Sequence, residues 1–171
     1  NWKCGSSARD LFKVIMLLCF ALLILLIPIK IPFNIYDEGF AVFNATRIMN
    51  GDIPYKDFWA IYPPGQFYTL AVLFKTFGTS LLISRVYDTF IRFIIVLSIW
   101  SIAKKITSRI LADLAFITAA LLLGSAKSYT YAVFPALALS LLSILNILKY
   151  INTGRLFWVL LAGILISFTA L

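Results

Sequence analysis

Long apolar stretches separated by short polar segments dominate the chain. The first runs from Leu11 to Ile29, with Lys13 as its one charged residue and with Pro28 and Pro32 at its end. A helix needs about 20 apolar residues to cross the hydrocarbon layer of a bilayer. The pattern predicts five membrane-spanning helices, at residues 11–29, 86–103, 110–124, 129–148 and 156–171.

The overall composition agrees with this pattern. Of the 171 residues, 62% are hydrophobic and 13% are charged, whereas a soluble domain has about 45–50% apolar and about 25% charged residues. Backbone groups that meet lipid must be satisfied within a helix or a closed barrel. We therefore expect an all-α, polytopic membrane helical bundle, and we exclude a soluble globular domain, a disordered chain and a coiled coil.

One apolar stretch, residues 66–83, is ambiguous because it contains Lys75 and Gly78 and follows Pro63-Pro64. Short cytoplasmic loops of membrane proteins carry an excess of Lys and Arg. If residues 66–83 do not cross the membrane, eight of the fifteen cations share one side with the N-terminus: Lys3, Arg9, Lys13, Lys104, Lys105, Arg109, Lys149 and Arg155. If the stretch does cross, five of them lie outside. We favour the first arrangement, with a cytoplasmic N-terminus and an extracytoplasmic loop over residues 30–85.

The charge balance narrows the choice of partners. Fifteen Lys and Arg stand against seven Asp and Glu, a net charge of +8. In a membrane protein such an excess faces the cytoplasm or anionic lipid, so we expect membrane lipids as partners and no nucleic acid. The chain has no His and only two Cys, and His is the commonest metal ligand. The two cysteines, Cys4 and Cys19, suggest neither a disulfide framework nor a zinc site.

Four of the seven acids lie in the loop 30–85. Asp37 and Glu38 fit the first turn of a helix, where the helix dipole favours negative charge, and Gly51 would end that helix. Its apolar side carries Phe40, Phe43, Ile48 and Met49, and its polar side carries Asn44, Arg47 and Asn50. The pattern predicts an amphipathic helix in the plane of the membrane interface. The simpler alternative is that both acids only cap a surface helix.

An ordered series of motifs follows the first predicted span. It consists of Asp37-Glu38-Gly39, Gly51, Pro54-Tyr55, Asp57-Phe58, Tyr62-Pro63-Pro64-Gly65, Phe77-Gly78 and Arg85. This series resembles the N-terminal part of the GT-C membrane glycosyltransferases, in the branch of the protein O-mannosyltransferases and the aminoarabinose lipid A transferases. The resemblance covers residues 11–171, and its specific motifs lie between residues 37 and 85.

The resemblance implies transfer of a sugar from a polyprenyl-phosphate donor to an acceptor on the extracytoplasmic side. It assigns the catalytic base to Asp37 and a supporting role in the same catalytic site to Glu38, which Arg85 would hold. A carboxylate within reach of an acceptor hydroxyl can remove its proton as the glycosidic bond breaks.

The donor phosphate needs nearby cations or a metal ion to stabilise its charge. The candidates for contacts with the substrate are Arg47, Lys56, Lys75 and Arg85. Tyr62 stands where the family often has Lys or His before Pro-Pro, so we count Tyr62 in the substrate region and expect Lys56 to replace the missing cation. A divalent cation held partly by Asp37 and Glu38 is a further option.

Two other functions stay open. Family members have more spans than five, so we expect these 171 residues to be the N-terminal part of a longer transmembrane domain. A non-catalytic GT-C-like subunit of a larger complex, with other membrane subunits as partners, also fits the short length. A transporter or flippase would use Asp88 and Arg92 in the second span, but it predicts paired repeats of broken helices. No repeat is visible, and we expect Asp88 and Arg92, spaced i and i+4, to form an internal ion pair.

Overall fold

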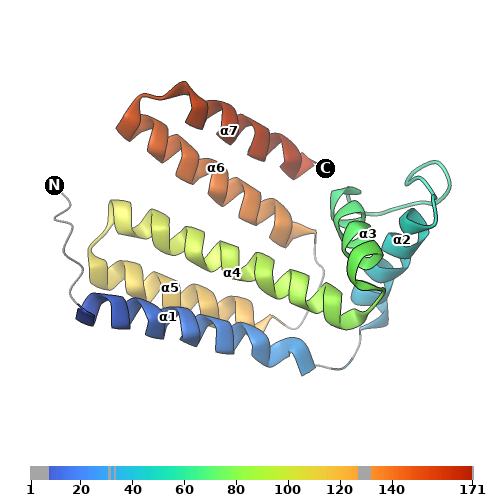
Figure 1. Ribbon diagram of the computed structural model, residues 1–171, viewed down its shortest axis with the longest axis horizontal. Helices are drawn as coiled ribbons and strands as arrows, with labels where there is room; N and C mark the ends of the chain where they lie inside the picture. The colour runs from blue at the N-terminus through green and yellow to red at the C-terminus, as the bar shows by residue number, and fades with distance from the viewer. Residues whose placement is uncertain (1–7, 31, 33, 127–131, 171) are drawn as a thin grey trace.

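The computed structural model describes residues 8–30, 32, 34–126 and 132–170, without the side chain of Arg9. Every regular element within these ranges is helical (Figure 1), which confirms the predicted all-α class. Lys3, residues 129–131 at the start of the fourth predicted span, and Leu171 lie outside the described residues.

Five helices form the elongated part of the molecule. They are α1 (Ala8–Leu26, continued by a 3₁₀ turn, Ile27–Lys30), α4 (Leu81–Ile106), α5 (Arg109–Ser125), α6 (Val133–Thr153) and α7 (Leu156–Ser167). Helices α1, α4 and α5 pack together, and α6 and α7 form a hairpin that meets the rest through α4 (Figure 1). We refer to these five helices as the bundle.

Three of the five predicted spans form helices long and apolar enough to cross a membrane, namely the helices of 10–30, 81–106 and 133–153. The other two are shorter, with 17 residues in α5 and 12 in α7. Helix α4 begins before the predicted residue 86 because the Ser80 side chain accepts a hydrogen bond from the backbone N–H of Leu82 at 3.1 Å. A side-chain cap of this kind stabilises the first turn of a helix.

The ambiguous stretch 66–83 does not form one helix. Helix α3 (Gly65–Phe77) ends at Gly78, whose φ of +90° few other residues adopt, and α4 then starts at Leu81. A helix of 13 residues is about 20 Å long, against the hydrocarbon thickness of about 30 Å. This stretch therefore lacks the length of a membrane-crossing helix.

Helices α2 (Phe40–Met49) and α3 pack on each other at one end of the bundle (Figure 1). We call residues 35–77 the end unit. Its core joins Ala41 and Ala45 of α2 to Phe67, Leu70 and Phe74 of α3. The two alanines let the helices approach closely, so the large side chains of α3 fill the space between them.

The predicted faces of α2 are partly wrong. Asn44, assigned to the polar side, is buried against α3, whereas Phe43, assigned to the apolar side, is 61% exposed. The small residues Ala41 and Ala45 form the inner face with Asn44, because only small side chains allow this helix contact. Helix α2 contains both polar and apolar residues, but some of its larger apolar side chains face outward.

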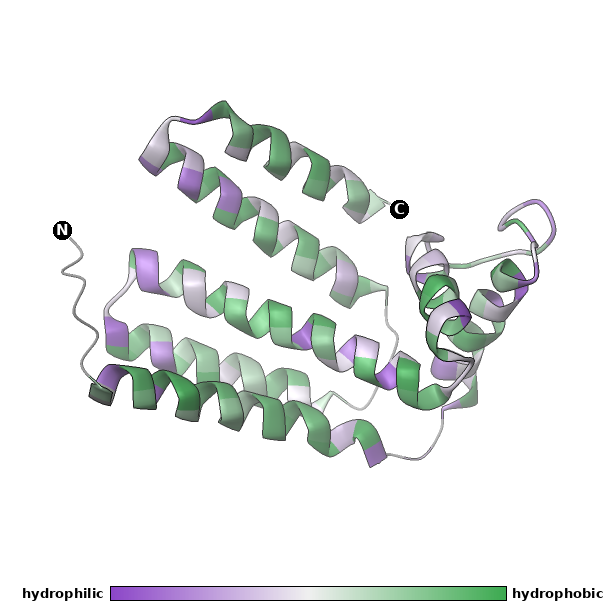
Figure 2. Cartoon of the chain, viewed as in Figure 1, coloured by the Kyte–Doolittle hydropathy of each residue, from purple (hydrophilic) through white to green (hydrophobic). Residues whose placement is uncertain are grey.

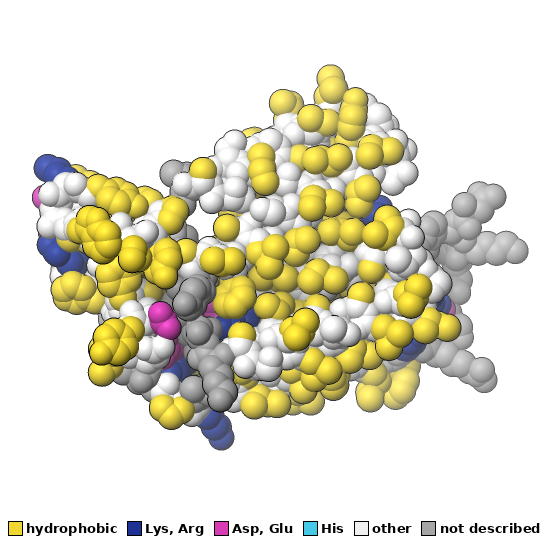
Figure 3. All heavy atoms as spheres, turned by 180° about the vertical axis from the view of Figure 1, so that it is seen from behind, with side chains coloured by type: hydrophobic (Ala, Val, Ile, Leu, Met, Phe, Trp, Pro, Cys, Tyr) yellow, Lys and Arg dark blue, Asp and Glu magenta, His cyan; other side chains and the backbone are white. Residues whose placement is uncertain are grey.

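Hydrophobic residues dominate the helices of the bundle (Figure 2), and hydrophobic side chains cover much of the face that Figure 3 shows. Inside, α1, α4 and α5 bury a core around Leu25, Val96 and Phe116. The ring of Trp100 meets Phe116 edge to face, with ring centroids 5.4 Å apart. An exposed apolar shell around a close-packed core is typical of helices that meet lipid rather than water.

The two ends of the bundle differ in charge. The start of α1, the α4–α5 turn and the α6–α7 turn lie at the end away from the end unit (Figure 1). We call it the basic end. The cations of the predicted cytoplasmic set whose side chains the structure describes belong to these segments: Lys13, Lys104, Lys105, Arg109, Lys149 and Arg155.

Candidate active site

The two adjacent acids, Asp37 and Glu38, lie on a single π-helical turn, Ile35–Gly39, that runs into α2. Asn34 caps this turn. Its side-chain Oδ1 accepts hydrogen bonds from the backbone N–H groups of Tyr36 at 3.0 Å and Asp37 at 3.4 Å. Its carbonyl accepts from the N–H groups of Glu38 and Gly39. The predicted placement of Asp37 and Glu38 in a first helical turn is confirmed.

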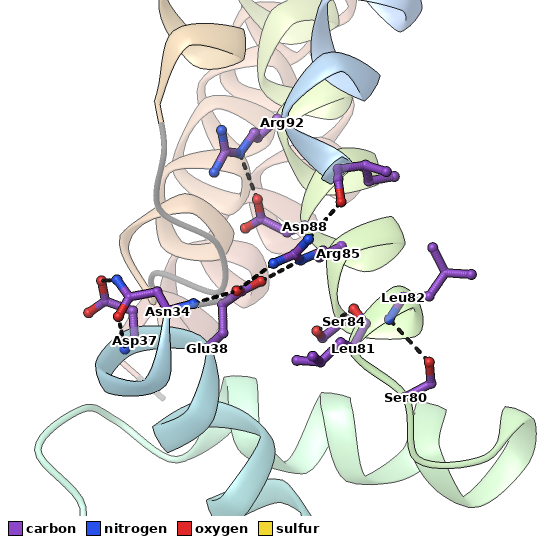
Figure 4. A network of polar contacts seen from close by, with 11 residues as sticks. Asn34, Asp37, Glu38, Ser80, Leu81, Leu82, Ser84, Arg85, Asp88 and Arg92 are labelled. Atoms are coloured by element: carbon purple, nitrogen blue, oxygen red, sulfur yellow. Dashed lines mark hydrogen bonds and ion pairs between the residues drawn. The ribbon is translucent and has the colours of Figure 1, made fainter. Parts of the chain in front are cut away.

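Glu38 is held by Arg85 in a two-pronged ion pair (Figure 4). Arg85 Nε donates to Glu38 Oε1 at 2.7 Å, and Arg85 Nη2 donates to Glu38 Oε2 at 2.8 Å. Both residues are buried, with Glu38 only 1% exposed. The pairing that the sequence resemblance implies is confirmed, and its parallel geometry is the strongest form of an Arg–carboxylate contact.

The same arginine joins three parts of the molecule. Arg85 belongs to α4, Glu38 belongs to the π turn, and Arg85 Nη1 also donates to the carbonyl of Ile29 at the end of α1 at 2.6 Å. A buried charge is costly unless it is paired and hydrogen-bonded, so breaking such a pair is strongly destabilising. Arg85 and Glu38 therefore fix the end unit onto the bundle.

Asp37 lies beside this pair in a different environment. Its side chain is half-buried, and Oδ2 accepts one hydrogen bond from Asn34 Nδ2 at 2.7 Å (Figure 4). Within the described part of the chain, Asp37 forms no ion pair and its Oδ1 accepts no hydrogen bond. Two neighbouring acids thus divide into a buried, paired Glu38 and an accessible, unpaired Asp37.

The next turns of α4 carry the second buried ion pair. Arg92 Nε donates to Asp88 Oδ2 at 2.6 Å, and Arg92 Nη1 donates to the carbonyls of Leu123 and Ala126 at the end of α5. The guanidinium also lies 4.5 Å from the centre of the Phe134 ring of α6. The predicted internal ion pair is confirmed, and it connects α4 to both α5 and α6.

Arg47 does not join the site. Its Nε donates to Asp52 at 2.6 Å, its Nη2 donates to the carbonyl of Asp57 at 3.0 Å, and its guanidinium lies over the Phe58 ring. It closes the loop that follows α2, ten residues along the helix from Asp37, or about 15 Å. Two of its N–H donors, one on Nε and one on Nη2, serve loop closure, and Arg47 as a phosphate contact stays a prediction.

The remaining predicted contacts are spread over the end unit. Lys56 and Lys75 are exposed and form no ion pair with any described residue. Lys56 belongs to the loop 51–64, which extends away from the bundle (Figure 1). Tyr62 is half-buried against the core of the end unit, and its carbonyl accepts from the Tyr55 hydroxyl at 2.9 Å. Of the predicted cations, only Arg85 touches an acid of the site.

The residues present do not fit a divalent cation held by the protein. In the part of the chain that the structure describes, no three acidic, His or Cys residues gather into a possible metal site. Both oxygens of Glu38 already accept from Arg85, which leaves Asp37 as the one available carboxylate. Hard divalent cations need six or more oxygen ligands, so we derive no step through a metal ion.

Sequence reasoning missed two features. One is Asn34, whose backbone N–H also donates to Glu38 Oε2 at 3.2 Å; an Asn before two acids was the available signal. The other is a polar cluster at the basic end, where Asp113 pairs with Lys13 and accepts from Trp100 Nε1 at 3.0 Å. No local spacing signals that cluster, because its members come from α1, α4 and α5.

The site therefore offers one half-buried carboxylate, Asp37, next to a buried ion pair that joins its turn to α4. A carboxylate of this kind can accept a proton from a hydroxyl group that reaches Oδ1. Comparison of the chain with protein-family models, with curated proteins and with solved structures found no match.

Proposed function

We propose that this chain forms part of a membrane glycosyltransferase that moves a sugar from a polyprenyl-phosphate donor to an acceptor hydroxyl. Asp37 is its catalytic base. The proposal combines the ordered motifs between residues 37 and 85, which resemble the GT-C glycosyltransferases, with the geometry around Asp37. The three apolar helices of membrane-spanning length supply the setting that a lipid-linked donor requires.

One observation carries the proposal: the adjacent acids Asp37 and Glu38 differ in burial and in pairing. Glu38 is 1% exposed and gives both oxygens to Arg85, so it cannot accept a proton without breaking the buried pair. Asp37 is half-buried and keeps Oδ1 without a described partner. A general base must be held in place and accessible to its substrate, and Asp37 is the acid of this pair that combines both properties.

The reaction balances with these residues alone. The acceptor hydroxyl oxygen forms a bond to the anomeric carbon while the bond from that carbon to the phosphate oxygen breaks. The electron pair leaves with the phosphate, and the hydroxyl proton passes to Asp37 Oδ1. A single displacement of this type inverts the configuration at the anomeric carbon. Glu38 and Arg85 hold the turn that carries Asp37, which makes Glu38 a positioning residue rather than a second base.

Charge supports an orientation in which the end unit is extracytoplasmic. The described cations of the predicted cytoplasmic set all belong to the basic end, and the end unit lies at the opposite end of the bundle (Figure 1). Positive residues in short loops favour the cytoplasmic side. The exposed side chains of Phe43, Tyr55 and Trp59 suit a position at the membrane interface, where aromatic residues concentrate. Of the predicted phosphate contacts, Lys56 and Lys75 form no ion pair with a described residue and are available to the donor phosphate there.

The test is transfer of a radiolabelled sugar by the full-length protein in lipid nanodiscs. The donors are undecaprenyl phosphates that carry mannose, glucose or aminoarabinose. Asp37→Asn removes the base without changing the shape of the side chain, and we expect kcat to fall by about 10²–10⁴-fold. Asp10→Asn is the matched control, because Asp10 pairs with Arg109 on the exposed surface of the basic end. Equal kcat in wild type and Asp37→Asn would reject Asp37 as the base.

A second candidate is a non-catalytic subunit that uses the same fold as a scaffold. The observation that favours it is the dispersal of the predicted phosphate contacts, since Arg47 closes its own loop and Lys56 lies on a segment that extends away from the bundle. A scaffold needs the Glu38–Arg85 pair but not the Asp37 carboxylate. Assembly that depends on Arg85, together with activity that is indifferent to Asp37→Asn, would favour this candidate.

A further inference from the structure

Asn34 is the point at which the two acids of the site meet (Figure 4). Its backbone N–H donates to Glu38 Oε2 at 3.2 Å, and its side-chain Nδ2 donates to Asp37 Oδ2 at 2.7 Å. Its side-chain Oδ1 accepts from the backbone N–H groups of Tyr36 and Asp37. One residue thus caps the turn and contacts both carboxylates.

The amide contact makes the two oxygens of Asp37 unequal. Oδ2 is bound by Asn34, whereas Oδ1 accepts no hydrogen bond from a described residue. The cap fixes the backbone of Asp37 as well, because the same side chain accepts from its N–H. The carboxylate therefore has a defined plane, with one oxygen held and the other presented.

We infer that Asn34 is a positioning residue that orients the Asp37 carboxylate so that Oδ1 receives the proton of the acceptor hydroxyl. The inference rests on the proposed function, in which Asp37 is the base. Misplacing a reacting group by about 1 Å can cost about 10²-fold in rate.

The chemistry of the side chain explains why an amide is needed. Asn has both an acceptor oxygen and a donor NH₂ group, so it caps the turn and binds a carboxylate at once. An ionised Asp accepts but does not donate. Ser caps well, but it has one hydroxyl group where Asn has a separate acceptor, Oδ1, and a separate donor, Nδ2. A Ser hydroxyl that caps the turn therefore leaves no NH₂ group to bind Asp37. The two roles of Asn34 are therefore separable by substitution.

The experiment compares wild type with Asn34→Asp, Asn34→Ser and Asn34→Ala in the full-length protein in nanodiscs. Thermal unfolding measures the contribution of the cap to stability, and transfer kinetics with the three labelled undecaprenyl-phosphate sugars measure the function of the base. We expect the unfolding temperature to depend on the cap, so that it is near wild type in Asn34→Asp and Asn34→Ser and lowest in Asn34→Ala. We expect kcat to follow the amide donor and to fall at least tenfold in all three variants, while KM for the donor changes less than twofold. Asn152→Ser, on the exposed end of α6, is the control that leaves both readouts unchanged.

The outcomes separate the two hypotheses. Wild-type kcat in Asn34→Ser or Asn34→Asp, together with an inactive Asp37→Asn, overturns the role of Asn34 and leaves the proposed function intact. Equal kcat in wild type and Asp37→Asn overturns the proposed function.

A wild type that transfers none of the three sugars also counts against that function. In that case the positioning role of Asn34 is tested by carbodiimide labelling of Asp37, measured by mass spectrometry. Without the Asn34 Nδ2 contact, Asp37 Oδ2 is no longer held and becomes accessible to the reagent, so labelling of Asp37 should be several-fold faster in Asn34→Ser. An unchanged rate overturns the inference.

Discussion

The acids at the two ends of the bundle differ in their ion-pair partners. At the basic end, Asp113 pairs with Lys13 and accepts from Trp100, and Asp10 pairs with Arg109, so both acids are neutralised by partners from other helices. At the end that carries the end unit, Glu38 is neutralised by Arg85 but its neighbour Asp37 is not. The acids that connect helices are paired, whereas Oδ1 of Asp37, the acid with a proposed chemical role, accepts no hydrogen bond from a described residue.

Two ion pairs, Arg85–Glu38 and Arg109–Asp10, one from each end, also differ in depth. The side chains of Arg85 and Glu38 are 10% and 1% exposed, whereas those of Arg109 and Asp10 are 56% and 41% exposed. Exposed pairs are screened by solvent and contribute little, while removal of one partner from a buried pair leaves an uncompensated charge. The comparison therefore predicts a graded series of effects on stability.

The largest loss is expected from Arg85→Leu. This change leaves Glu38 buried without its two charged hydrogen bonds, and the free energy of unfolding should fall by about 3–5 kcal/mol. Denaturant titration of the protein in detergent micelles measures it. The double variant Glu38→Leu/Arg85→Leu removes both charges and should be more stable than Arg85→Leu alone. A loss of less than about 1 kcal/mol in Arg85→Leu alone would be typical of a surface ion pair. That result would contradict the distinction between the buried and the exposed pairs.

An intermediate loss is expected where α1 and α5 approach each other near the site. A Cβ atom added at Gly124 would lie 2.5 Å from Ile24 Cγ2 and 2.9 Å from the Ile24 carbonyl oxygen. Gly124→Ala should lower the free energy of unfolding by about 1–3 kcal/mol through overpacking.

Gly163 in α7 is the matched control, since nothing lies within 4 Å of an added Cβ there. Gly163→Ala should stabilise the protein by about 0.5–1 kcal/mol, because Ala favours a helix more than Gly does. The same sign of effect at both positions would contradict the close packing of α1 on α5.

A smaller loss is expected from Asp113→Asn at the basic end. The amide oxygen can still accept from Trp100 Nε1, but the ion pair with the half-exposed Lys13 is lost. We expect a decrease of about 1 kcal/mol in the free energy of unfolding, well below that of Arg85→Leu. The same denaturant titration measures both, and equal losses would remove the contrast between the two ends.

The smallest effect is expected from Arg109→Ala. The pair of Arg109 with Asp10 joins α5 to α1 across an exposed surface. Its loss should cost at most about 0.5 kcal/mol and should vanish at high salt, because solvent and ions screen such pairs. A loss above about 2 kcal/mol would indicate a structural role that exposure argues against.

The sequence predicted the helical class and the positions of the long helices because runs of apolar residues determine both. It predicted the Asp88–Arg92 pair from i, i+4 spacing, and the Glu38–Arg85 pair through the motif resemblance. It could not predict that Arg47 closes the loop after α2, because Asp52 and Asp57 become its partners only once the loop folds back. It also missed the cluster around Asp113, whose contact with Lys13 spans 100 positions of the chain.

The function of Asp37 is tested most directly by one paired measurement on the full-length protein in nanodiscs. Sugar transfer and thermal unfolding are recorded for Asp37→Asn and for Glu38→Gln. The proposal predicts that Asp37→Asn loses about 10²–10⁴-fold in kcat with an unfolding temperature close to wild type, whereas Glu38→Gln unfolds at a clearly lower temperature. Wild-type kcat in Asp37→Asn would contradict the division of roles between the two acids.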